Sequence, residues 1–459
     1  MKPNGKRTAL AFGLMFALGT ASIADVTKPD VAPARTCFSD GLAKAGKGDW
    51  QGAILDFSNA IERDPSAFSA YAERGLARLN VGELKGAIED YSKAIEGEPK
   101  KPMYYLNRGV ARRWAGDVIG AISDCSKAIG LDPSCGLAYY NRGVAEMDNR
   151  DFETSISDFA KAIEINPTYE KAYCNRGSAK SRKGDYREAI ADFSKAIALD
   201  PTDAVAYSGR GLAKVELGEF EGSIADLSEA ISIDRNYIPA LEARGIAERK
   251  LGEAAAALAD FSRAIALDPK DAAAYRLRSM ARVDMDDVEG AMADLSKAVE
   301  LDPKRPAVYD KRGICWNIRG EFHNAYADFE TAVQLAKGDA TYPRFGLFLI
   351  DRRLKRGDPV ACLRTAVHGW KDGWPKTVGL FLVGEMTEAA FLDSASKGDS
   401  KTASENQCAA RYYSGMLHLL DGDDAMAKSL FTECVAAGHP DFVEVAFARA
   451  ELNRLNAKH

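Results

Sequence analysis

The residues that most often catalyse reactions are present in this sequence, but they lack the spacing of the common catalytic and metal-binding motifs. No histidine belongs to an HExxH motif or to a cysteine–histidine cluster with zinc spacing; the five are His323, His368, His418, His439 and His459. No GxSxG motif offers a nucleophilic serine. The sequence therefore predicts no catalytic residue, no metal site and no cofactor.

One segment resembles a phosphate-binding loop without completing it. Residues 41–47 (GLAKAGK) match the P-loop as far as its lysine. The next residue is Gly48, where the motif needs a serine or threonine to bind magnesium. The segment is better explained as a helix that runs into a turn, so nucleotide binding is not expected.

The elements that position these residues follow a 34-residue period. The period is marked by prolines at Pro65, Pro99, Pro133, Pro167 and Pro201, and the same step then reaches Arg235, Pro269 and Pro303. Nine units result, with alanine at the twenty-seventh position of all nine and glycine at the eighth position of eight. Small residues let two helices approach closely, a large residue at the twenty-fourth position fills the space between them, and proline ends the second helix. Each unit therefore predicts a helix–turn–helix hairpin.

This spacing and residue pattern resembles that of the tetratricopeptide-repeat (TPR) family. The resemblance implies an all-α solenoid, wound as a right-handed superhelix, whose concave groove is lined by the first helix of each repeat. We assign nine repeats to residues 34–339, degenerate hairpins and a flexible loop to 340–407, and a final repeat with a capping helix to 408–459. Within the second region, residues 394–407 (SASKGDSKTASENQ) are predicted to be the loop.

Two charged positions recur within the repeat. The seventh position is arginine in eight repeats, and the twenty-third is aspartate in all nine. One interpretation is an ion pair between the two helices of a hairpin. The alternative is a local pair along the second helix, such as Asp90 with Lys93 or Asp158 with Lys161. Either pair would be structural, because a catalytic pair is not repeated along an array.

In the TPR family the second, fifth, sixth, ninth, twelfth and thirteenth positions of the repeat face the groove. Here the sixth position holds Asn107, Asn141 and Asn175 in three consecutive repeats. Their amides offer a donor and an acceptor that match a peptide backbone. The arrangement resembles the asparagine ladder in the TPR superhelix of O-GlcNAc transferase. We therefore predict peptide binding by these three residues, flanked by Tyr140 and Lys171. The alternative is that asparagine is only a polar filler on the wet side of the helix.

The N-terminus has the features of an export signal. Basic residues precede the apolar segment Ala9–Leu18, and Ser22 and Ala24 provide small residues for cleavage before Asp25. We expect a cleaved signal peptide over residues 1–24, a linker over 25–33 and a periplasmic or secreted protein. The alternative is a retained helical anchor.

Charge limits the classes of partner. Loss of residues 1–24, which hold three basic and no acidic residues, takes the formal net charge from -6 to -9. Binding to nucleic acid or to an anionic membrane needs a basic face, so neither is expected. The predicted partners are other proteins or extended peptides, and the negative balance favours basic or neutral ones.

Eight cysteines are present in a chain that we expect to meet an oxidising compartment. Cys125 replaces the large residue at the twenty-fourth position of its repeat and is predicted to be a buried free thiol. Cys408 and Cys434 occupy the first and twenty-seventh positions of the final hairpin, where antiparallel helices bring such positions together. Their spacing leaves open a disulfide or two separately buried thiols.

The order of elements in the C-terminal quarter resembles that of the NlpI family of envelope TPR lipoproteins. This order is a degenerate hairpin, a segment bearing Trp374, a final repeat and a helix opening with Phe442 and Val443. The resemblance implies an envelope adaptor that recruits proteases or cell-wall hydrolases, and it leaves a homodimer open. This chain lacks a lipidation cysteine after its apolar segment, which puts membrane anchoring in doubt. The competing hypotheses are a structural scaffold of an envelope complex and an enzyme that depends on His368 or Asp372.

Overall fold

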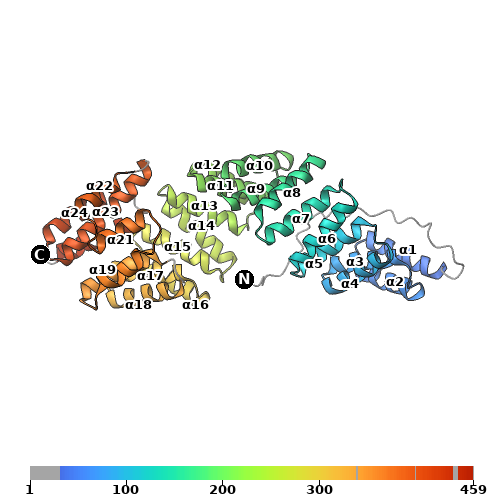
Figure 1. Ribbon diagram of the computed structural model, residues 1–459, viewed down its shortest axis with the longest axis horizontal. Helices are drawn as coiled ribbons and strands as arrows, with labels where there is room; N and C mark the ends of the chain where they lie inside the picture. Colours follow the sequence, from blue (N-terminus) through green and yellow to red (C-terminus); the bar gives the residue numbers. More distant parts are fainter. Residues whose placement is uncertain (1–31, 337–339, 398–399, 438–442, 458–459) are drawn as a thin grey trace. The chain divides into compact units, whose positions relative to one another are not determined.

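The computed structural model describes residues 32–336, 340–397, 400–437 and 443–457, and every regular element in these ranges is an α-helix (Figure 1). This confirms the predicted all-α fold class. The predicted signal peptide lies outside the described residues, as does the linker up to residue 31. None of the described helices has the length and apolar character needed to cross a bilayer.

The chain divides into two compact units, the first ending at Leu199 and the second beginning at Asp200. The first unit contains five helical hairpins in sequence order. Their helices are α1 (Ala32–Gly46), α2 (Trp50–Arg63), α3 (Phe68–Val81), α4 (Leu84–Gly97), α5 (Pro102–Trp114), α6 (Val118–Leu131), α7 (Gly136–Asp148), α8 (Phe152–Ile165), α9 (Glu170–Lys183) and α10 (Tyr186–Leu199). Helix α1 begins two residues before the predicted start of the first repeat.

The second unit opens with four further hairpins, formed by α11 (Ala204–Leu217), α12 (Phe220–Ile233), α13 (Ile238–Lys250), α14 (Ala254–Leu267), α15 (Ala272–Asp284), α16 (Val288–Leu301), α17 (Pro306–Arg319) and α18 (Phe322–Leu335). Seven more helices follow, namely α19 (Thr341–Leu354), α20 (Pro359–Val367), α21 (Trp374–Leu382), α22 (Glu388–Ala395), α23 (Ser400–Leu420), α24 (Asp424–Ala437) and α25 (Val443–Ala457).

The turn inside a hairpin depends on glycine followed by an acidic residue. Gly116 has φ +90°, a left-handed conformation that only glycine adopts without strain. The next residue, Asp117, caps α6 by accepting a hydrogen bond from the backbone N–H of Gly120 at 2.9 Å. Only three residues therefore separate the end of α5 from the start of α6, which keeps the two helices antiparallel.

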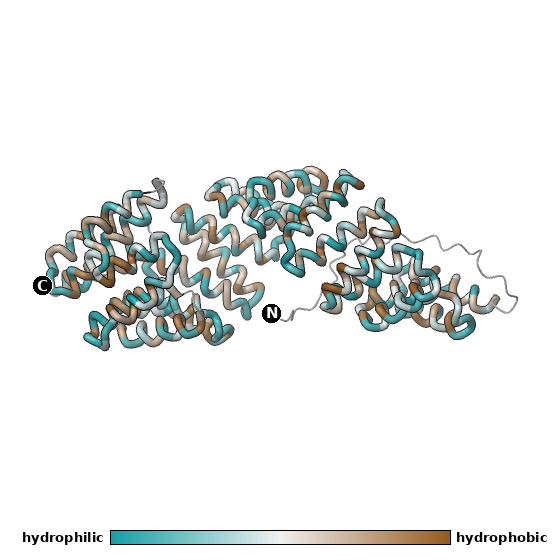
Figure 2. The backbone as a smooth tube through the Cα atoms, viewed as in Figure 1, coloured by the Kyte–Doolittle hydropathy of each residue, from teal (hydrophilic) through white to brown (hydrophobic). Residues whose placement is uncertain are grey.

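The core of each hairpin is built by a small residue against a large one. A Cβ atom added to Gly143 would lie 3.0 Å from the ring of Phe159, which is fully buried. Gly245 and Phe261 repeat this arrangement in the second unit, where the added Cβ would lie 2.7 Å from the ring. Figure 2 shows hydrophobic and hydrophilic residues interspersed along the helices, the pattern of amphipathic helices that bury one face.

The recurring arginine and aspartate form ion pairs between the two helices of a hairpin. Arg108 donates from Nε and Nη2 to the two carboxylate oxygens of Asp124, at 2.9 and 2.8 Å. The same cross-helix pair joins Arg74 to Asp90, Arg142 to Asp158, Arg176 to Asp192, Arg210 to Asp226, Arg244 to Asp260, Arg278 to Asp294 and Arg312 to Asp328. The first repeat has no such arginine, and its Asp56 pairs with Lys44 at 2.7 Å.

The alternative of local pairs along the second helix is wrong for the residues considered. Lys93 binds Glu96, and Lys161 binds Glu164, each at 2.7 Å. The aspartates face the first helix, where the bidentate arginine fork offers more hydrogen bonds than a lysine ammonium. The carboxylates are therefore buried in the hairpin instead of lying on its surface.

A second basic residue, four positions after the arginine, binds the same aspartate in five of these repeats; these residues are Arg78, Arg112, Lys180, Lys214 and Arg282. In the seventh repeat this position holds Glu248, which is buried beside Asp260. Burial, together with the Asp260 carboxylate, raises the pKa of Glu248 to about 7, and Arg244 opposes the rise.

Replacing Glu248 by glutamine is expected to stabilise the second unit at pH 8 by about 1–2 kcal/mol. The folded-state pKa lies above the unfolded value, so this group lowers stability as pH rises from about 4.5 to about 7 and keeps it lowered above that range. Urea unfolding at pH 5 and pH 8 measures the effect. The free energy of unfolding should differ less between pH 5 and pH 8 in Glu248→Gln than in the wild type. The exposed change Glu300→Gln should leave this difference as it is in the wild type. Equal pH dependence in the wild type and Glu248→Gln would show that Glu248 ionises normally.

The degenerate hairpin predicted for residues 342–372 is formed by α19 and α20, and Asp358 caps α20 through the backbone N–H of Ala361. The flexible loop predicted for residues 394–407 is wrong over much of its length, because α23 begins at Ser400. Residues 402–407 (TASENQ) include the strong helix formers alanine, glutamate and glutamine. Their polarity is that of a largely solvent-exposed helix face, so composition alone suggested a loop.

Candidate functional site

The five predicted binding residues lie on first helices of the first unit, and all are half-buried. Asn107 is on α5, Tyr140 and Asn141 are on α7, and Lys171 and Asn175 are on α9. The sixth position of three consecutive repeats thus presents asparagine on equivalent helices. The contacts of the three amides, however, differ from one another.

Asn175 and Tyr140 are brought together by the packing of α9 against α7. The Asn175 amide donates from Nδ2 to the Tyr140 hydroxyl at 2.9 Å. The Tyr140 ring packs against the rings of Tyr169 and Phe159, with centroids 4.8 and 5.7 Å away. Burial raises the pKa of Tyr140 to about 12, so its hydroxyl stays protonated at neutral pH and keeps a proton to donate. The pair is a preorganised polar group on an aromatic base.

The other two amides have different neighbours. Asn141 donates from Nδ2 to the backbone carbonyl of Leu137 at 2.8 Å, one turn earlier on its own helix. Asn107 lies beside the buried hydroxyl of Tyr91, whose pKa is raised well above its usual value by burial, while Asn107 opposes that rise. Both amides retain a carbonyl oxygen that can accept a hydrogen bond. A ladder along a bound peptide stays a prediction.

A charged pair near these residues was missed in the sequence. Arg113 on α5 donates from Nη1 to a carboxylate oxygen of Asp148 on α7 at 3.0 Å. Its charge also opposes the rise in the pKa of Tyr140, which places it near that hydroxyl. Arg113 and Asp148 stand at the twelfth and thirteenth positions of their repeats, which the TPR pattern assigns to the groove. Opposite charges at these positions of two consecutive repeats are the sequence signal for this pair.

The second unit contains a cavity of about 370 Å³ that sequence reasoning did not anticipate. One wall comes from α17, where the cavity meets Asp310, Lys311 and Ile314, at the fifth, sixth and ninth positions of the ninth repeat. The other walls come from α13, α18, α19, α21, α23 and α25. The C-terminal helices therefore close over groove positions of the last repeat in the array.

The closing helix α25 is fixed to the array by buried charges. Arg454 donates from Nη2 to the backbone carbonyl of Ile318, near the end of α17, at 2.7 Å. The carboxylate of Glu451, 3% exposed, binds Arg353 of α19 at 2.9 Å and Arg454 at 2.6 Å. Helix α25 has an apolar stripe in which Val445, Ala448 and Leu455 are buried and Leu452 is half-buried. The helix lies against α17 and α24 and is more than a cap on the last hairpin.

Tandem helical hairpins with a small-against-large core and a glycine–aspartate turn define an α-helical repeat solenoid. Tetratricopeptide-repeat models match residues 40–102, 137–169, 170–203, 204–237 and 242–306. The repeat array of this chain belongs to the tetratricopeptide-repeat family. Such repeats mediate protein–protein interaction or peptide binding, so the family implies a protein or peptide partner.

Several solved structures are similar to parts of the chain. A tetratricopeptide repeat protein from Parabacteroides merdae ATCC 43184 is 20% identical over 54% of this chain and 98% of its own, with a TM-score of 0.45. MamA is 27% identical over 36% of this chain and 96% of its own, with a TM-score of 0.34. YrrB, described as a TPR protein with an unusual peptide-binding site, is 20% identical over 41% of this chain and 96% of its own, with a TM-score of 0.35. No curated protein sequence matches the chain significantly.

Proposed function

We propose that the protein is an adaptor that binds extended segments of partner proteins on the first helices of its repeats. The observation that carries this proposal is the Tyr140–Asn175 pair with Arg113 and Asp148 beside it. These groups place hydrogen-bond donors, acceptors and an aromatic surface on three successive first helices. The arginines and aspartates of the repeat, by contrast, satisfy one another inside the hairpins and are not available to a partner.

We further propose that the adaptor is exported to the periplasm and brings envelope proteases or cell-wall hydrolases to their substrates. The N-terminal sequence pattern and the order of elements in the C-terminal quarter support this finer proposal. The repeat family supports a protein partner but does not identify it. A structural scaffold with one fixed partner is the alternative outcome of the experiment below.

The experiment is crosslinking of the chain from Asp25 to His459 in native periplasm, followed by mass spectrometry of the captured proteins. A variant with Asn107, Asn141 and Asn175 changed to alanine runs in parallel, with Asn324→Ala, an exposed change on α18, as the control. Each lost hydrogen bond weakens binding by about 0.5–1.5 kcal/mol, so the triple variant should bind captured partners at least about tenfold more weakly.

If proteases or hydrolases are captured by the wild type and the control but not by the triple variant, the adaptor proposal is supported. The same result supports binding by the asparagine face, the surface formed by Asn107, Asn141 and Asn175. A single partner captured at fixed stoichiometry supports the scaffold instead. If the partners persist unchanged with the triple variant, the asparagine face is not the binding surface. If nothing is captured by any of the three proteins, the adaptor proposal is overturned.

A further inference from the structure

The cavity of the second unit combines an aromatic lining with an excess of carboxylates. Its volume, about 370 Å³, lies in the range of roughly 300–1,000 Å³ that is usual for small-ligand pockets. It is bounded by one face of the array and by the C-terminal helices, so it exists only because α23 and α25 pack back onto α17 and α19. The cavity is distinct from the asparagine face of the first unit.

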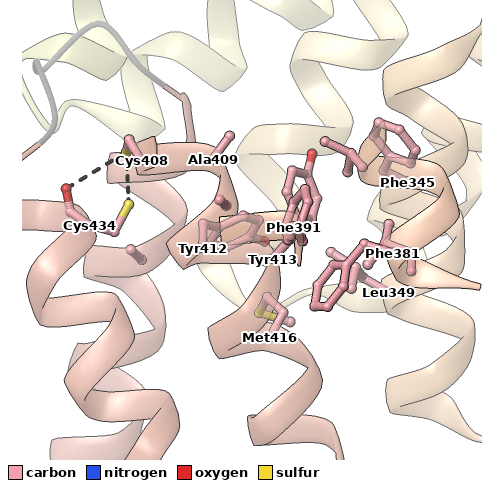
Figure 3. Close-up of a cluster of buried hydrophobic side chains, with 14 of the residues drawn as sticks. Phe345, Leu349, Phe381, Phe391, Cys408, Ala409, Tyr412, Tyr413, Met416 and Cys434 are labelled. Atoms are coloured by element: carbon pink, nitrogen blue, oxygen red, sulfur yellow. Dashed lines mark hydrogen bonds between the residues drawn. The ribbon is translucent and has the colours of Figure 1, made fainter. Parts of the chain in front are cut away.

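The aromatic lining is continuous and fixed in place. Phe345 on α19 lies edge-on to Tyr413 of α23 and to Tyr342, with ring centroids 5.6 and 6.1 Å away. Phe345 and Tyr413 are buried, whereas Tyr342 is 57% exposed and lies at the mouth of the cavity. Figure 3 shows the buried part of this cluster, in which Phe345, Tyr412 and Tyr413 lie among other buried hydrophobic side chains.

The charges that line the cavity do not balance. Lys311 of α17 pairs with its neighbour Asp310 at 3.2 Å. Two further carboxylates, from Glu405 on α23 and Glu444 on α25, also line the cavity. Among the described residues, neither forms an ion pair. Burial raises the pKa of Tyr342, and the charges of Glu444 and Glu405 raise it further. Because both carboxylates act on the same hydroxyl, they lie at the same end of the cavity.

Glu444 forms no ion pair among the described residues, although its own backbone N–H and the nearby Lys311 both favour its charged form. It lies in the first turn of α25, and burial raises its pKa while Lys311 opposes the rise. A carboxyl group that faces an aromatic cavity without a counter-charge is costly, unless a ligand supplies the charge. A cation is the ligand that would remove this cost.

We propose that this cavity binds the cationic side chain of an arginine or lysine from a partner protein. Aromatic faces and carboxylates are the groups that hold a guanidinium or an ammonium, through cation–π contacts and charge-assisted hydrogen bonds. The aliphatic part of such a side chain would contact Phe345 and Ile314, while its charged end would meet Glu405 and Glu444. The net negative charge of the chain points to the same class of partner. The proposal rests on the adaptor function and adds to it a preference for basic segments.

Other ligand classes fit the lining less well. An anion would face three carboxylates, those of Glu405, Glu444 and Asp310, and only two ammonium groups, those of Lys250 and Lys311. A wholly apolar ligand would cover Glu444 and leave its carboxyl group without a partner. The charge and the aromatic surface together therefore select a side chain that is both cationic and partly apolar.

The test uses the mature chain and two synthetic pentapeptides, Ac-Gly-Gly-Arg-Gly-Gly-amide and the same peptide with citrulline in place of arginine. Citrulline keeps the shape of the side chain and removes its charge. Isothermal titration calorimetry should show the arginine peptide binding at least tenfold more tightly than the citrulline peptide. Glu444→Gln and Glu405→Gln should each weaken the arginine peptide several-fold, and together should abolish the preference for arginine.

Two further variants keep the test independent of folding. Tyr342→Ala removes an exposed ring at the mouth and should weaken the arginine peptide without changing the circular dichroism spectrum. Glu300→Gln, at an exposed residue of α16, should change nothing. Equal affinity for both peptides, or full binding by the folded double glutamine variant, would overturn the cavity proposal.

This result is separable from the adaptor proposal. If periplasmic partners are captured but the peptides bind equally, only the cavity proposal fails. If the arginine peptide binds but no protein is captured from the periplasm, the cavity proposal stands and the adaptor proposal fails.

Discussion

Replacing Asp124 by alanine is expected to lower the free energy of unfolding of the first unit by about 3–5 kcal/mol, because it removes one partner of a buried ion-pair network. Asp124 is 3% exposed and accepts hydrogen bonds from Arg108 at 2.9 and 2.8 Å and from Arg112 at 2.8 Å. The substitution leaves the Arg108 guanidinium between α5 and α6 without a counter-charge, and it leaves Arg112 with only the exposed Asp117 carboxylate, 3.6 Å away. Urea unfolding followed by circular dichroism measures the loss.

Two controls separate the lost ion pair from other effects. Asp117→Asn changes a solvent-exposed carboxylate at the start of the same helix and should cost less than about 1 kcal/mol, because asparagine also caps helices. The double variant Asp124→Ala with Arg108→Met should be less destabilised than the single Asp124→Ala variant, because the guanidinium that loses its only carboxylate partner is then absent and Arg112 keeps Asp117. A loss below about 1 kcal/mol in Asp124→Ala would show that the array does not depend on this network.

Oxidation is expected to join Cys408 and Cys434 and to raise the stability of the second unit by about 3–4 kcal/mol. Their Sγ atoms lie 2.9 Å apart, on the antiparallel helices α23 and α24, and both side chains are fully buried (Figure 3). The residues are 26 positions apart, so a crosslink would restrict a long segment of the unfolded chain. The structure thus brings the two thiols together, as the register of the final hairpin suggested.

The measurement is a thiol count and thermal unfolding of protein refolded with and without oxidised glutathione. Refolding is needed because burial and the neighbouring Cys408 thiol raise the pKa of Cys434, which makes its thiolate scarce in the folded protein. The oxidised form should have two fewer thiols. In the Cys408→Ser variant, the same treatment should change neither the thiol count nor the stability. Cys125 and Cys315 serve as internal controls when oxidised glutathione is added after folding, because burial in the folded protein raises the pKa of each to about 12 and both should then stay reduced. An unchanged thiol count would favour two separately buried thiols.

The three asparagines share a position in the repeat, but that position alone does not predict what each side chain contacts. Their common position was visible in the sequence, and the structure places them on equivalent helices. What each amide contacts depends on its neighbours: Asn175 meets Tyr140 from the preceding repeat, whereas Asn141 turns back to its own helix. Repeats that share a framework therefore differ in the groups that they offer to a partner.

The sequence by itself determined the repeat, because every contact that defines a hairpin joins residues close together in the chain. Arg108 and Asp124 are 16 residues apart, and their pairing follows from two antiparallel helices joined by a short turn. The glycine–aspartate turns, the buried alanines and the all-α class follow from the same local constraints.

Only the tertiary structure decided how the C-terminal helices pack against the last repeat. Arg454 binds the backbone of α17 across 136 residues, and Arg353 reaches Glu451 across 98. No period in the sequence encodes contacts of this kind, because they depend on the path by which α19 to α25 fold back onto the last repeat of the array. The aromatic and acidic cavity lies along that path, so its residues carry no shared motif and come together only when the helices pack.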